Sequence, residues 1–449
     1  MDVVIIGNGI SGITAAKWVR KLSDHNIKVI SSESEHFFSR TALMYVYMGH
    51  MRYEDIKPYE DWFWGKNRIE LIFDHVNAVD PTNKNLILKD GGKLSYDKLI
   101  IACGSKSNKF GWPGQDLKGV SGLYHLQDLE AMESFSKDLE RAVIVGGGLI
   151  GIEMAEMFHS RNIPVTMLVR EEHYWDNVLP REEAIMIGNH IIEHHIDLRL
   201  GSNLSEIIDD GNGRCAGVIV KETEEKINCG YVGLTPGVSP NISFLKSSGI
   251  EINRGILVNN QLCTNYDDIY AIGDCAELRD PRPGRKPIEA VWYTGRMMGE
   301  TVAYNICGSE IDYDPGIWFN SAKFFDIEYQ VYGDVPRTIE PPLDSIYWQH
   351  EDGKKSVRIT YNINSLKVKG FNLMGIRYRH ELCEQWLREE THMDQVMEQL
   401  ALANFDPEFF KSYETEIINT YTKKTGRQVA LKSKRRLNSV LKFLNSSIG

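Results

Sequence analysis

Residues 3–12 read VVIIGNGISG, an apolar run followed at once by three spaced glycines. Such a continuous apolar run is typical of a strand buried on both faces of a parallel sheet. Gly7 then allows a tight turn, Gly9 leaves room for a pyrophosphate, and Gly12 lets the next helix pack closely. Residues 13–20 read as that helix, whose N-terminal N–H groups and dipole favour phosphate. The stretch predicts half of a dinucleotide-binding unit.

A second strand, Ile27–Ile30, and the acid after it extend this unit. Glu33 lies about twenty residues beyond the third glycine, where a carboxylate accepts hydrogen bonds from a ribose. The alternative is a chance glycine turn with a surface glutamate. We favour the dinucleotide site because strand, turn, helix and acid occur in the expected order.

The same pattern recurs at residues 142–169. A predicted strand leads into Gly146-x-Gly148-x-x-Gly151, and a helix over 152–160 and a strand over 165–169 follow. A repeat of this kind indicates two dinucleotides. The acid expected after the second strand is missing, and Arg170 follows Val169 instead. This arginine is compatible with binding the 2′-phosphate of NADP and equally with a solvated surface position.

The length and composition of the chain are those of a globular protein with several domains. The chain has 449 residues and a formal net charge of −11, which argues against general nucleic-acid binding. No apolar run is long enough to span a bilayer, and we expect no signal peptide, since the first strand leaves no room for one. The seven cysteines form no C-x-x-C or zinc-like pair. We therefore expect free thiols, a reducing cytoplasm and no metal site.

The remaining chain alternates between predicted strands and helices. In its middle part, strands are predicted at residues 71–79, 85–89, 93–94, 99–101 and 269–272, hairpins within 198–230, and a helix at 288–306. From residue 311 a smaller α+β region is predicted, with strands at 319–331, 345–349, 356–361 and 366–374 and helices at 381–390, 393–404, 407–421 and 431–444.

Four motifs occur in an order that identifies a family resemblance. They are Gly7-x-Gly9-x-x-Gly12, the turn Ala102-Cys103-Gly104, Gly146-x-Gly148-x-x-Gly151 and Tyr270-Ala271-Ile272-Gly273-Asp274. On them, residues 1–380 resemble the pyridine nucleotide–disulfide oxidoreductase family of flavoproteins. Within it the chain is most similar to rubredoxin and ferredoxin reductases, NADH oxidases and the flavin part of nitrite reductase, on Phe38-Ser39-Arg40 and residues 324–333.

The resemblance implies an α/β fold with two Rossmann-like dinucleotide-binding domains, the NAD(P) domain inserted in the FAD domain. The expected division is residues 1–112 with 233–308 for FAD, 113–232 for NAD(P), 309–380 for a C-terminal α+β domain of the interface type, and 381–449 for a helical extension. The resemblance also implies a homodimer.

The resemblance further implies where FAD and NADH or NADPH bind. FAD meets Glu33 at its adenosine ribose, Gly9 and Ser11 at its pyrophosphate, and Asp274 at its ribityl chain or phosphate. Asp274 is alternatively a helix N-cap, and Glu153, expected near the nicotinamide, is alternatively an exposed first-turn glutamate on the helix dipole. The cofactor-binding set is Gly7, Gly9, Ser11, Gly12, Glu33, Arg40, Val76, Cys103, Gly104, Gly146, Gly148, Ile150, Gly151, Glu153, Arg170, Gly237, Gly273 and Asp274.

The chain departs from its relatives in the interval after Glu33. Relatives carry a C-x-x-x-x-C pair or a single redox cysteine there, but residues 33–68 contain no cysteine. Tyr45 stands where rubredoxin-reductase relatives carry a lysine. Arg40 is kept, either to stabilise negative charge near the flavin or as a structural ion pair. Cys103 replaces a threonine, and we interpret it as a small buried residue.

These departures predict an FAD-dependent NAD(P)H oxidoreductase that passes electrons directly to an outside acceptor, with no certain catalytic residue beyond the candidates Arg40 and Glu153. A carrier protein, a quinone, oxygen and nitrite are all compatible acceptors. The alternative is a flavin-bearing subunit or redox-sensing scaffold that binds a partner through its C-terminal helices.

A basic segment near the C-terminus, called the basic tail, indicates which kinds of partner the chain could bind. Its cations are Lys423, Lys424, Arg427, Lys432, Lys434, Arg435 and Arg436, and an apolar face follows at Leu437, Val440, Leu441 and Leu444. The tail is compatible with an anionic membrane surface or an acidic carrier protein. A solvated helix packed on the body of the protein is the plainer alternative.

Overall fold

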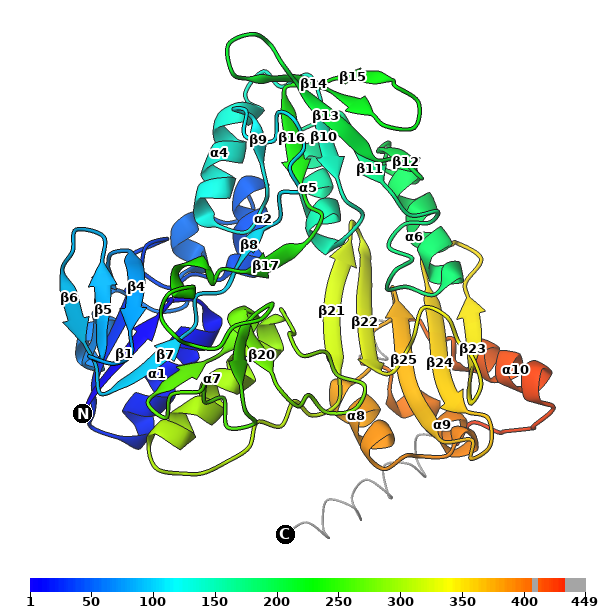
Figure 1. The fold of residues 1–449 in the computed structure, drawn as a ribbon. Helices are drawn as coiled ribbons and strands as arrows, with labels where there is room; N and C mark the ends of the chain where they lie inside the picture. The colour runs from blue at the N-terminus through cyan, green and yellow to red at the C-terminus, as the bar shows by residue number, and fades with distance from the viewer. Residues whose placement is uncertain (406–410, 433–449) are drawn as a thin grey trace. The chain divides into compact units, whose positions relative to one another are not determined.

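The computed structural model describes residues 1–405 and 411–432 (Figure 1). The chain forms two compact units. Unit 1 contains residues 1–170 and 202–315, and unit 2 contains residues 171–201 and those from 316 onward. The four-part division expected from the sequence stays a prediction. No helix among the described residues is both long and apolar enough to cross a membrane.

The first sheet of unit 1 is built on the apolar run after Met1. Its five parallel strands lie in the order β19 (Ile269–Ala271), β7 (Lys98–Ile101), β1 (Asp2–Ile6), β2 (Asn26–Ser31) and β3 (Ile69–Phe73). Val3, Val4 and Ile5 have no exposed surface, as expected for a strand covered on both faces. The predicted strand at residues 71–79 is wrong, because the chain turns at Asp74 and His75 between β3 and β4.

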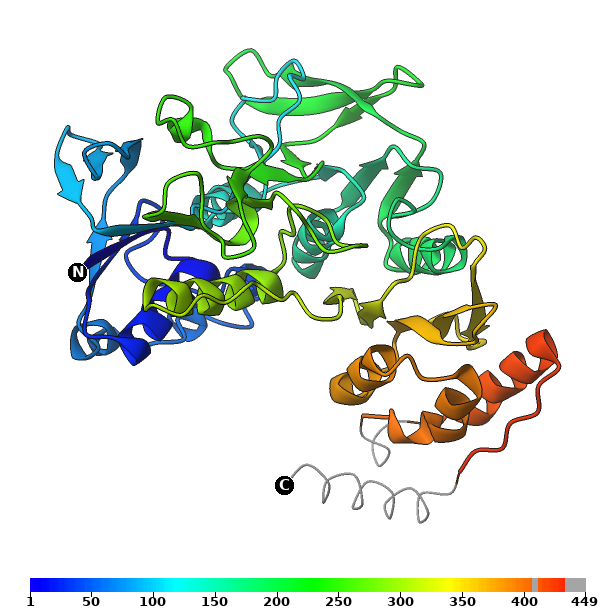
Figure 2. The same ribbon diagram turned by 60° about the horizontal axis from the view of Figure 1, so that its bottom comes forward.

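Two helices of unit 1 lie side by side, as both ribbon views show (Figures 1 and 2). They are α1 (Ile10–Leu22) and α7 (Trp292–Ile306), which confirm the helices predicted at 13–20 and 288–306 with different starting residues. A side chain at Gly299 would place its Cβ 2.5 Å from the carbonyl oxygen of Ser11. The small residue therefore lets α7 approach the start of α1, where the glycine motif ends.

The repeated glycine unit forms a second parallel sheet. Strands β11 (Val165–Val169), β10 (Ala142–Val145), β16 (Tyr231–Leu234) and β9 (Val120–Ser121) lie in that order. The predicted helix is confirmed as α5 (Leu149–Ser160), whereas the sequence did not predict α2 (Leu43–Tyr47), α3 (Trp62–Lys66) or α4 (Leu126–Ser136).

Short antiparallel strands complete unit 1. They are β4 (Val76–Asp80), β5 (Asn85–Leu88) and β6 (Lys93–Ser95), then β13 (Leu204–Asp209), β14 (Cys215–Val220) and β15 (Lys226–Asn228), and the pair β8 (Ser105–Ser107) with β17 (Val238–Pro240). A parallel pair, β18 (Ile256–Val258) with β20 (Ala276–Leu278), accompanies them. The meander and the hairpins predicted from the sequence are thereby confirmed.

Unit 2 is an antiparallel sheet with helices on both faces (Figure 2). Its strands lie in the order β21 (Phe319–Phe324), β22 (Ile327–Gly333), β25 (Val368–Met374), β24 (Ser356–Asn362) and β23 (Leu343–Gln349). Side chains alternate along β24. Val357 and Ile359 enter the core shared with α8 (His380–Arg388), α9 (Met393–Gln399) and α10 (Glu414–Thr425), while Arg358 meets α6 (Arg181–Glu193). Strand β12 (Asp197–Leu200) follows α6.

Two further sequence predictions change in unit 2. Residues 319–331 were expected as one strand, but the chain turns at Phe325, whose φ is 55°, and makes the hairpin β21–β22. The helix predicted at 407–421 begins at Glu414, and residues 406–410 lie outside the described part of the chain. The predicted helix at 431–444 lies almost wholly in residues 433–449, which are likewise outside it.

Candidate functional site

The first glycine motif forms a cradle between β1 and α1. A Cβ at Gly7, whose φ is +105°, would lie 2.1 Å from the carbonyl oxygen of Ala102, and one at Gly12 would lie 2.0 Å from that of Gly7. A Cβ at Gly9 would meet nothing within 4 Å. Helix α1 starts at the next residue with no acid in its first turn. The cradle therefore offers open space at a helix N-terminus, where an anion is stabilised.

The second motif repeats this geometry in the same unit. A Cβ at Gly146 would lie 2.5 Å from the carbonyl oxygen of Thr235, and one at Gly151 would lie 2.4 Å from that of Gly146. A Cβ at Gly148 would meet nothing within 4 Å. Ile150 follows as the second residue of α5, whose first turn also lacks an acid. Unit 1 thus holds two cradles of matching geometry, each at a helix N-terminus.

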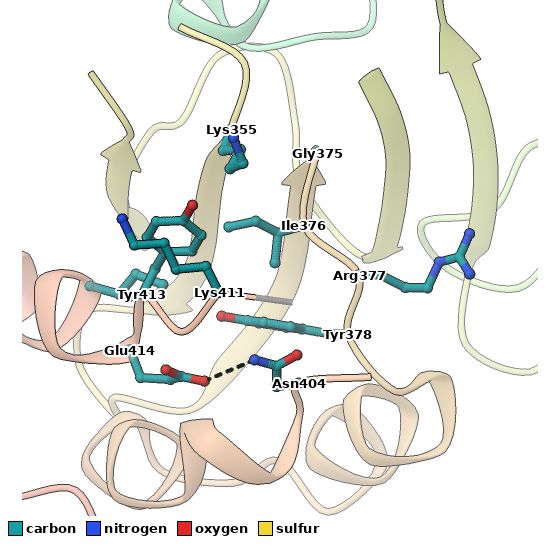
Figure 3. Close-up of a pocket in the computed structure, with 10 residues that line it drawn as sticks. Lys355, Gly375, Ile376, Arg377, Tyr378, Asn404, Lys411, Tyr413 and Glu414 are labelled. Atoms are coloured by element: carbon teal, nitrogen blue, oxygen red, sulfur yellow. Dashed lines mark hydrogen bonds between the residues drawn. The ribbon is translucent and has the colours of Figure 1, made fainter. Parts of the chain in front are cut away.

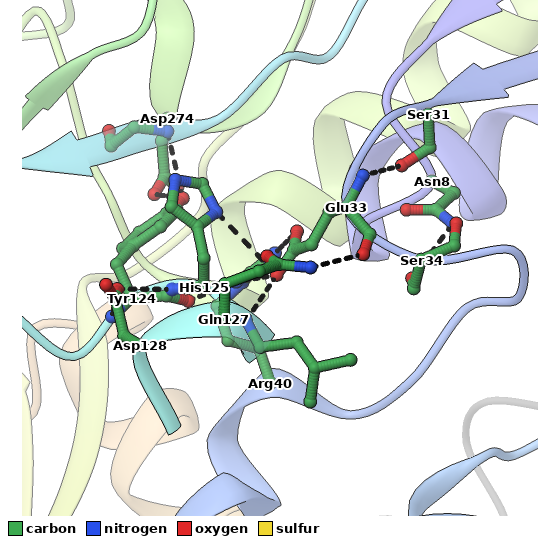
Figure 4. Close-up of polar contacts among 12 residues, drawn as sticks. Asn8, Ser31, Glu33, Ser34, Arg40, Tyr124, His125, Gln127, Asp128 and Asp274 are labelled. Carbon is green, nitrogen blue, oxygen red and sulfur yellow. Dashed lines mark hydrogen bonds and ion pairs between the residues drawn. The ribbon is translucent and has the colours of Figure 1, made fainter. Parts of the chain in front are cut away.

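Glu33 and Arg40 form a bidentate ion pair (Figure 4). The Arg40 guanidinium donates to Oε1 and Oε2 of Glu33 at 2.8 and 2.6 Å and also to the carbonyl oxygen of Tyr124. The backbone N–H of Leu126 donates to Glu33 Oε1 at 2.9 Å. Burial raises the pKa of Glu33, but hydrogen bonds from His125 and Arg40 outweigh it and bring the pKa to about 2. Glu33 is therefore ionised, and of the two roles considered for Arg40 the ion pair is present.

Asp274 lies inside the turn Gly273–Cys275, directly after β19. The Tyr124 hydroxyl donates to Asp274 Oδ2 at 2.9 Å and accepts the Ser105 N–H at 2.9 Å (Figure 4). Burial raises the pKa of the Asp274 carboxyl. The N-cap of this turn is Ile272, so the alternative of Asp274 as a helix N-cap is wrong.

Sequence reasoning missed the segment that joins these two acids. Tyr124 and His125 precede α4 and contact both Asp274 and Glu33, and the Gln127 side-chain amide donates to the Glu33 carbonyl oxygen at 2.8 Å. The only signal was Asp128, which accepts the N–H groups of residues 124 and 125 and so begins the helix. With no Ser, Thr, Asp or Asn at the N-cap, this signal is weak.

Cys103, Gly104 and Ser11, which were predicted for the FAD side, lie around the turn Gly273–Cys275. Cys103 Sγ donates to the Asn241 carbonyl oxygen at 3.4 Å, and contact with Cys275 together with burial raises the pKa of the Cys103 thiol. A Cβ at Gly104 would lie 2.8 Å from the Tyr124 hydroxyl. Ser11 is buried, with its hydroxyl against Gly273.

Two further residues of the predicted set are Val76 and Gly237. Val76 is buried at the start of β4. The carbonyl of Gly237 accepts the N–H of Asn108 at 3.0 Å, immediately before β17. Both residues belong to unit 1, and their contact with a cofactor stays a prediction.

Glu153 lies in the second turn of α5, not the first, and is half-buried. Burial, and then the neighbouring Glu156, raise its pKa to about 7. A helix dipole acting on an exposed first-turn glutamate would lower the pKa instead, so that alternative does not describe this residue. Arg170, at the end of β11, is exposed. Its contact with a nucleotide stays a prediction.

We expect Glu153→Gln to remove a pH dependence of stability. The ordinary glutamate pKa of 4.5 rises to about 7 on folding, so the folded chain binds the extra proton and loses stability as pH rises through that window. Above it the cost is at most about 3 kcal/mol. Urea unfolding at pH 4 and pH 8 should show the variant matching the native chain at the acidic pH and exceeding it at the alkaline one. Glu130→Gln, at an exposed site of α4, is the control. The expectation would be refuted if the unfolding free energy of Glu153→Gln changed between pH 4 and pH 8 by the same amount as that of the native chain.

A cavity in unit 2 is separate from this chemistry (Figure 3). It is lined by Lys355, Gly375, Ile376, Arg377, Tyr378, Asn404, Lys411, Tyr413, Glu414 and Ile417. Asn404 Nδ2 donates to the buried Glu414 carboxylate at 3.4 Å. Every residue of the predicted cofactor-binding set belongs to unit 1, so this cavity is no part of the dinucleotide cradles.

Four cations of the predicted basic tail, Lys423, Lys424, Arg427 and Lys432, lie in the described part of unit 2, and the last three are paired with acids. Lys424 bonds Asp344 Oδ1 at 2.5 Å, Arg427 Nε donates to Asp394 Oδ1 at 2.8 Å, and Lys432 pairs with Glu398. These contacts are those of a segment packed on its own unit. Lys434, Arg435, Arg436 and the apolar face lie outside the described residues.

Comparisons with known proteins agree with this geometry. The family model described as pyridine nucleotide-disulphide oxidoreductase matches residues 1–299. NADH-rubredoxin oxidoreductase of Clostridium acetobutylicum is 30% identical over 334 residues, 74% of this chain and 82% of that protein. Rubredoxin-NAD(+) reductase of Ectopseudomonas oleovorans is 26% identical over 312 residues, 69% of this chain and 80% of that protein. The solved NAD-dependent persulfide reductase from A. fulgidus shares the fold, with a TM-score of 0.83, 21% identity and coverage of 95% of this chain and 84% of that one.

Proposed function

Because the chain belongs to the pyridine nucleotide-disulphide oxidoreductase family, we propose that it passes electrons from NADH or NADPH, through bound FAD, directly to a small carrier protein of the rubredoxin class. Family membership makes it a pyridine nucleotide-dependent flavin oxidoreductase that uses FAD and NADH or NADPH. The direct route to a carrier is the new element. The observation that carries it is the absence of any cysteine from residues 33–68.

The two cradles fit two dinucleotides. Each has a glycine whose Cβ direction is open beside the first turn of a helix, which is what a pyrophosphate needs to approach the backbone. Gly9 and α1 would hold the pyrophosphate of FAD, and Gly148 and α5 that of NADH or NADPH. Bound FAD supplies the group that accepts hydride and releases electrons one at a time.

The chain's own side chains set the charge along the FAD side. Glu33, kept ionised by Arg40 and His125, offers carboxylate oxygens to a ribose, and its fixed orientation limits the entropy lost on binding. At the other end the Tyr124 hydroxyl orients Asp274, which can then accept from a ribityl hydroxyl. Glu153, with a pKa of about 7, can hold a proton beside the second cradle at neutral pH.

Thiol chemistry is disfavoured where the chain does place cysteines near Asp274. A thiol relays electrons as the thiolate, but the pKa of Cys103 is raised and its Sγ is hydrogen-bonded to the backbone. The rubredoxin-named relatives support a carrier protein as the acceptor. A direct route from FAD to the carrier therefore fits this chain better than a cysteine relay.

We expect Cys103→Ser to reduce a rubredoxin at the native rate per bound FAD, within about twofold. Serine keeps a donor for the hydrogen bond to Asn241 and removes the sulfur that a thiol relay would need. The measurement is anaerobic rubredoxin reduction with NADH and with NADPH, normalised to FAD content. Abolition of carrier reduction, with reduction of FAD by NADH intact, would establish a thiol relay and overturn the proposal. Failure of the native chain to reduce any carrier, with stable co-purification of a second protein, would favour the scaffold instead.

A further inference from the structure

Unit 2 places two histidines and an aspartate within ligand distance of one another. His190 lies in the last turn of α6, and His194, one turn later, is the C-cap of that helix. Asp326 comes from the turn between β21 and β22. Their ligand atoms all lie within 4.8 Å of one another. Asp326 Oδ1 is 2.6 Å from His190 Nε2 and 3.5 Å from His194 Nε2. Two separate elements thus aim three donor atoms at one point.

His190 is the member of this cluster whose surroundings most favour a bound ligand. Its side chain is 1% exposed, and neither of its ring nitrogens has a hydrogen-bond partner among the described residues. Asp326 Oδ1 lies 2.6 Å from His190 Nε2 as an ion-pair contact that does not meet hydrogen-bond geometry. Glu193, 3.6 Å from His190 Nδ1, is too distant. A buried polar group left without a partner is costly, and a metal ion would satisfy the nitrogen that faces Asp326.

The surroundings of His194 suit a metal ligand. Its Nδ1 lies 2.9 Å from the carbonyl oxygen of His190, which can only accept, so Nδ1 carries a proton and Nε2 is the ring nitrogen that faces Asp326 Oδ1, at 3.5 Å. The Phe325 ring stacks on the imidazole at 4.2 Å between centroids and 17° between planes.

Lys354 is the competing cation. Its Nζ lies 3.8 Å from Asp326 Oδ2 and 4.0 Å from Glu193 Oε2. It therefore balances the carboxylates when no metal is bound, and a divalent ion must compete with its charge. Asp326 is 60% exposed, so an ion can reach the cluster from solvent.

We propose that His190, His194 and Asp326 bind a divalent ion of the Zn²⁺ type, with water in the remaining position. Two imidazole nitrogens and one carboxylate oxygen form a three-residue set of the kind zinc accepts, with metal–ligand distances of about 2.0–2.2 Å. Such an ion would join α6 to the β21–β22 hairpin within unit 2. The proposal does not depend on the acceptor of the flavin electrons.

The test is titration of the full-length, chelator-treated chain with Co²⁺, whose visible absorption reports tetrahedral nitrogen and oxygen ligands. We expect saturation at one ion per chain, and displacement by Zn²⁺. Asp326→Asn and His194→Gln, at positions that are 60% and 26% exposed, should each weaken binding at least ~10–100-fold. Lys354→Met should tighten binding several-fold, because it removes the competing charge.

His195→Gln, at the exposed neighbour of His194, is the matched control and should bind Co²⁺ as the native chain does. Zn²⁺ should raise the thermal unfolding midpoint of the native chain but not of Asp326→Asn. Absence of saturable Co²⁺ absorption, or binding that Asp326→Asn and His194→Gln leave unchanged, would overturn the site and leave a plain histidine–aspartate contact.

Discussion

Gly148→Leu is expected to give a yellow protein that NADH and NADPH no longer reduce at a useful rate. A Cβ at this position meets nothing within 4 Å, so a side chain can leave the backbone there without a clash at its first carbon. The same space is where the pyrophosphate must approach the start of α5. Loss of one or two charge-assisted hydrogen bonds costs roughly 3 kcal/mol, on the order of 100-fold in affinity. Stopped-flow reduction over a range of NADH and NADPH concentrations measures this loss of nucleotide affinity.

The matching variant in the first cradle separates the two sites. Gly9→Leu, where a Cβ also meets nothing within 4 Å, should yield a folded protein that holds little FAD. Gly12→Ala should instead fail to fold well, because its Cβ would lie 2.0 Å from a carbonyl oxygen. If Gly148→Leu lost FAD, or if Gly9→Leu kept it, the assignment of the two cradles would be wrong.

Arg358→Met is expected to cost unit 2 about 3–5 kcal/mol of stability. The Arg358 guanidinium donates to Oε1 and Oε2 of Glu183 at 2.7 and 2.8 Å and to Ser345 Oγ at 2.9 Å. The Glu183 side chain is fully buried, so removal of the arginine leaves a buried charge whose remaining donor among the described residues is the Asn372 amide, at 3.3 Å. Urea unfolding at pH 7, followed by tryptophan fluorescence and circular dichroism, measures the loss.

Two variants test the cause of this loss. Arg377→Met breaks a surface pair with Glu328, whose side chains are 37% and 48% exposed, and should cost no more than about 1 kcal/mol. The double variant Arg358→Met with Glu183→Leu removes both charges and should recover most of the stability. An equal loss in Arg358→Met and Arg377→Met would contradict the buried-charge explanation.

The parts of the fold that could be predicted from local sequence are those in which a pattern of residues fits a single kind of structure. The apolar strand β1, the glycines at positions 7, 9 and 12, and their repeat at 146–151 all occur where expected. A Cβ at Gly7, Gly12, Gly146 or Gly151 would collide with a backbone oxygen, whereas one at Gly9 or Gly148 would enter the open space beside the start of a helix. Glu33 could be predicted from its spacing of about twenty residues beyond the third glycine, whereas Asp274 was indicated by the family resemblance.

What the sequence could not predict depends on contacts between distant segments. Tyr124 meets Asp274 across 150 residues of chain, and Arg358 meets Glu183 across 175. Tyrosine and arginine occur in many structural roles, so the contacts of Tyr124 and Arg358 could not be predicted from the sequence around each residue. His190 and His194 showed helical spacing, but their third partner comes from a hairpin that the sequence indicated as a single strand.

Hydride transfer between two pockets of one chain is the claim on which the rest depends. It is tested most directly by mixing the purified, FAD-saturated chain with one equivalent of NADH or NADPH in the absence of oxygen. The account predicts that the yellow absorbance of FAD disappears with at least one of the two nucleotides and returns when an oxidised carrier protein is added. A chain that stays fully yellow with an excess of both nucleotides, while dithionite bleaches it, would contradict the account.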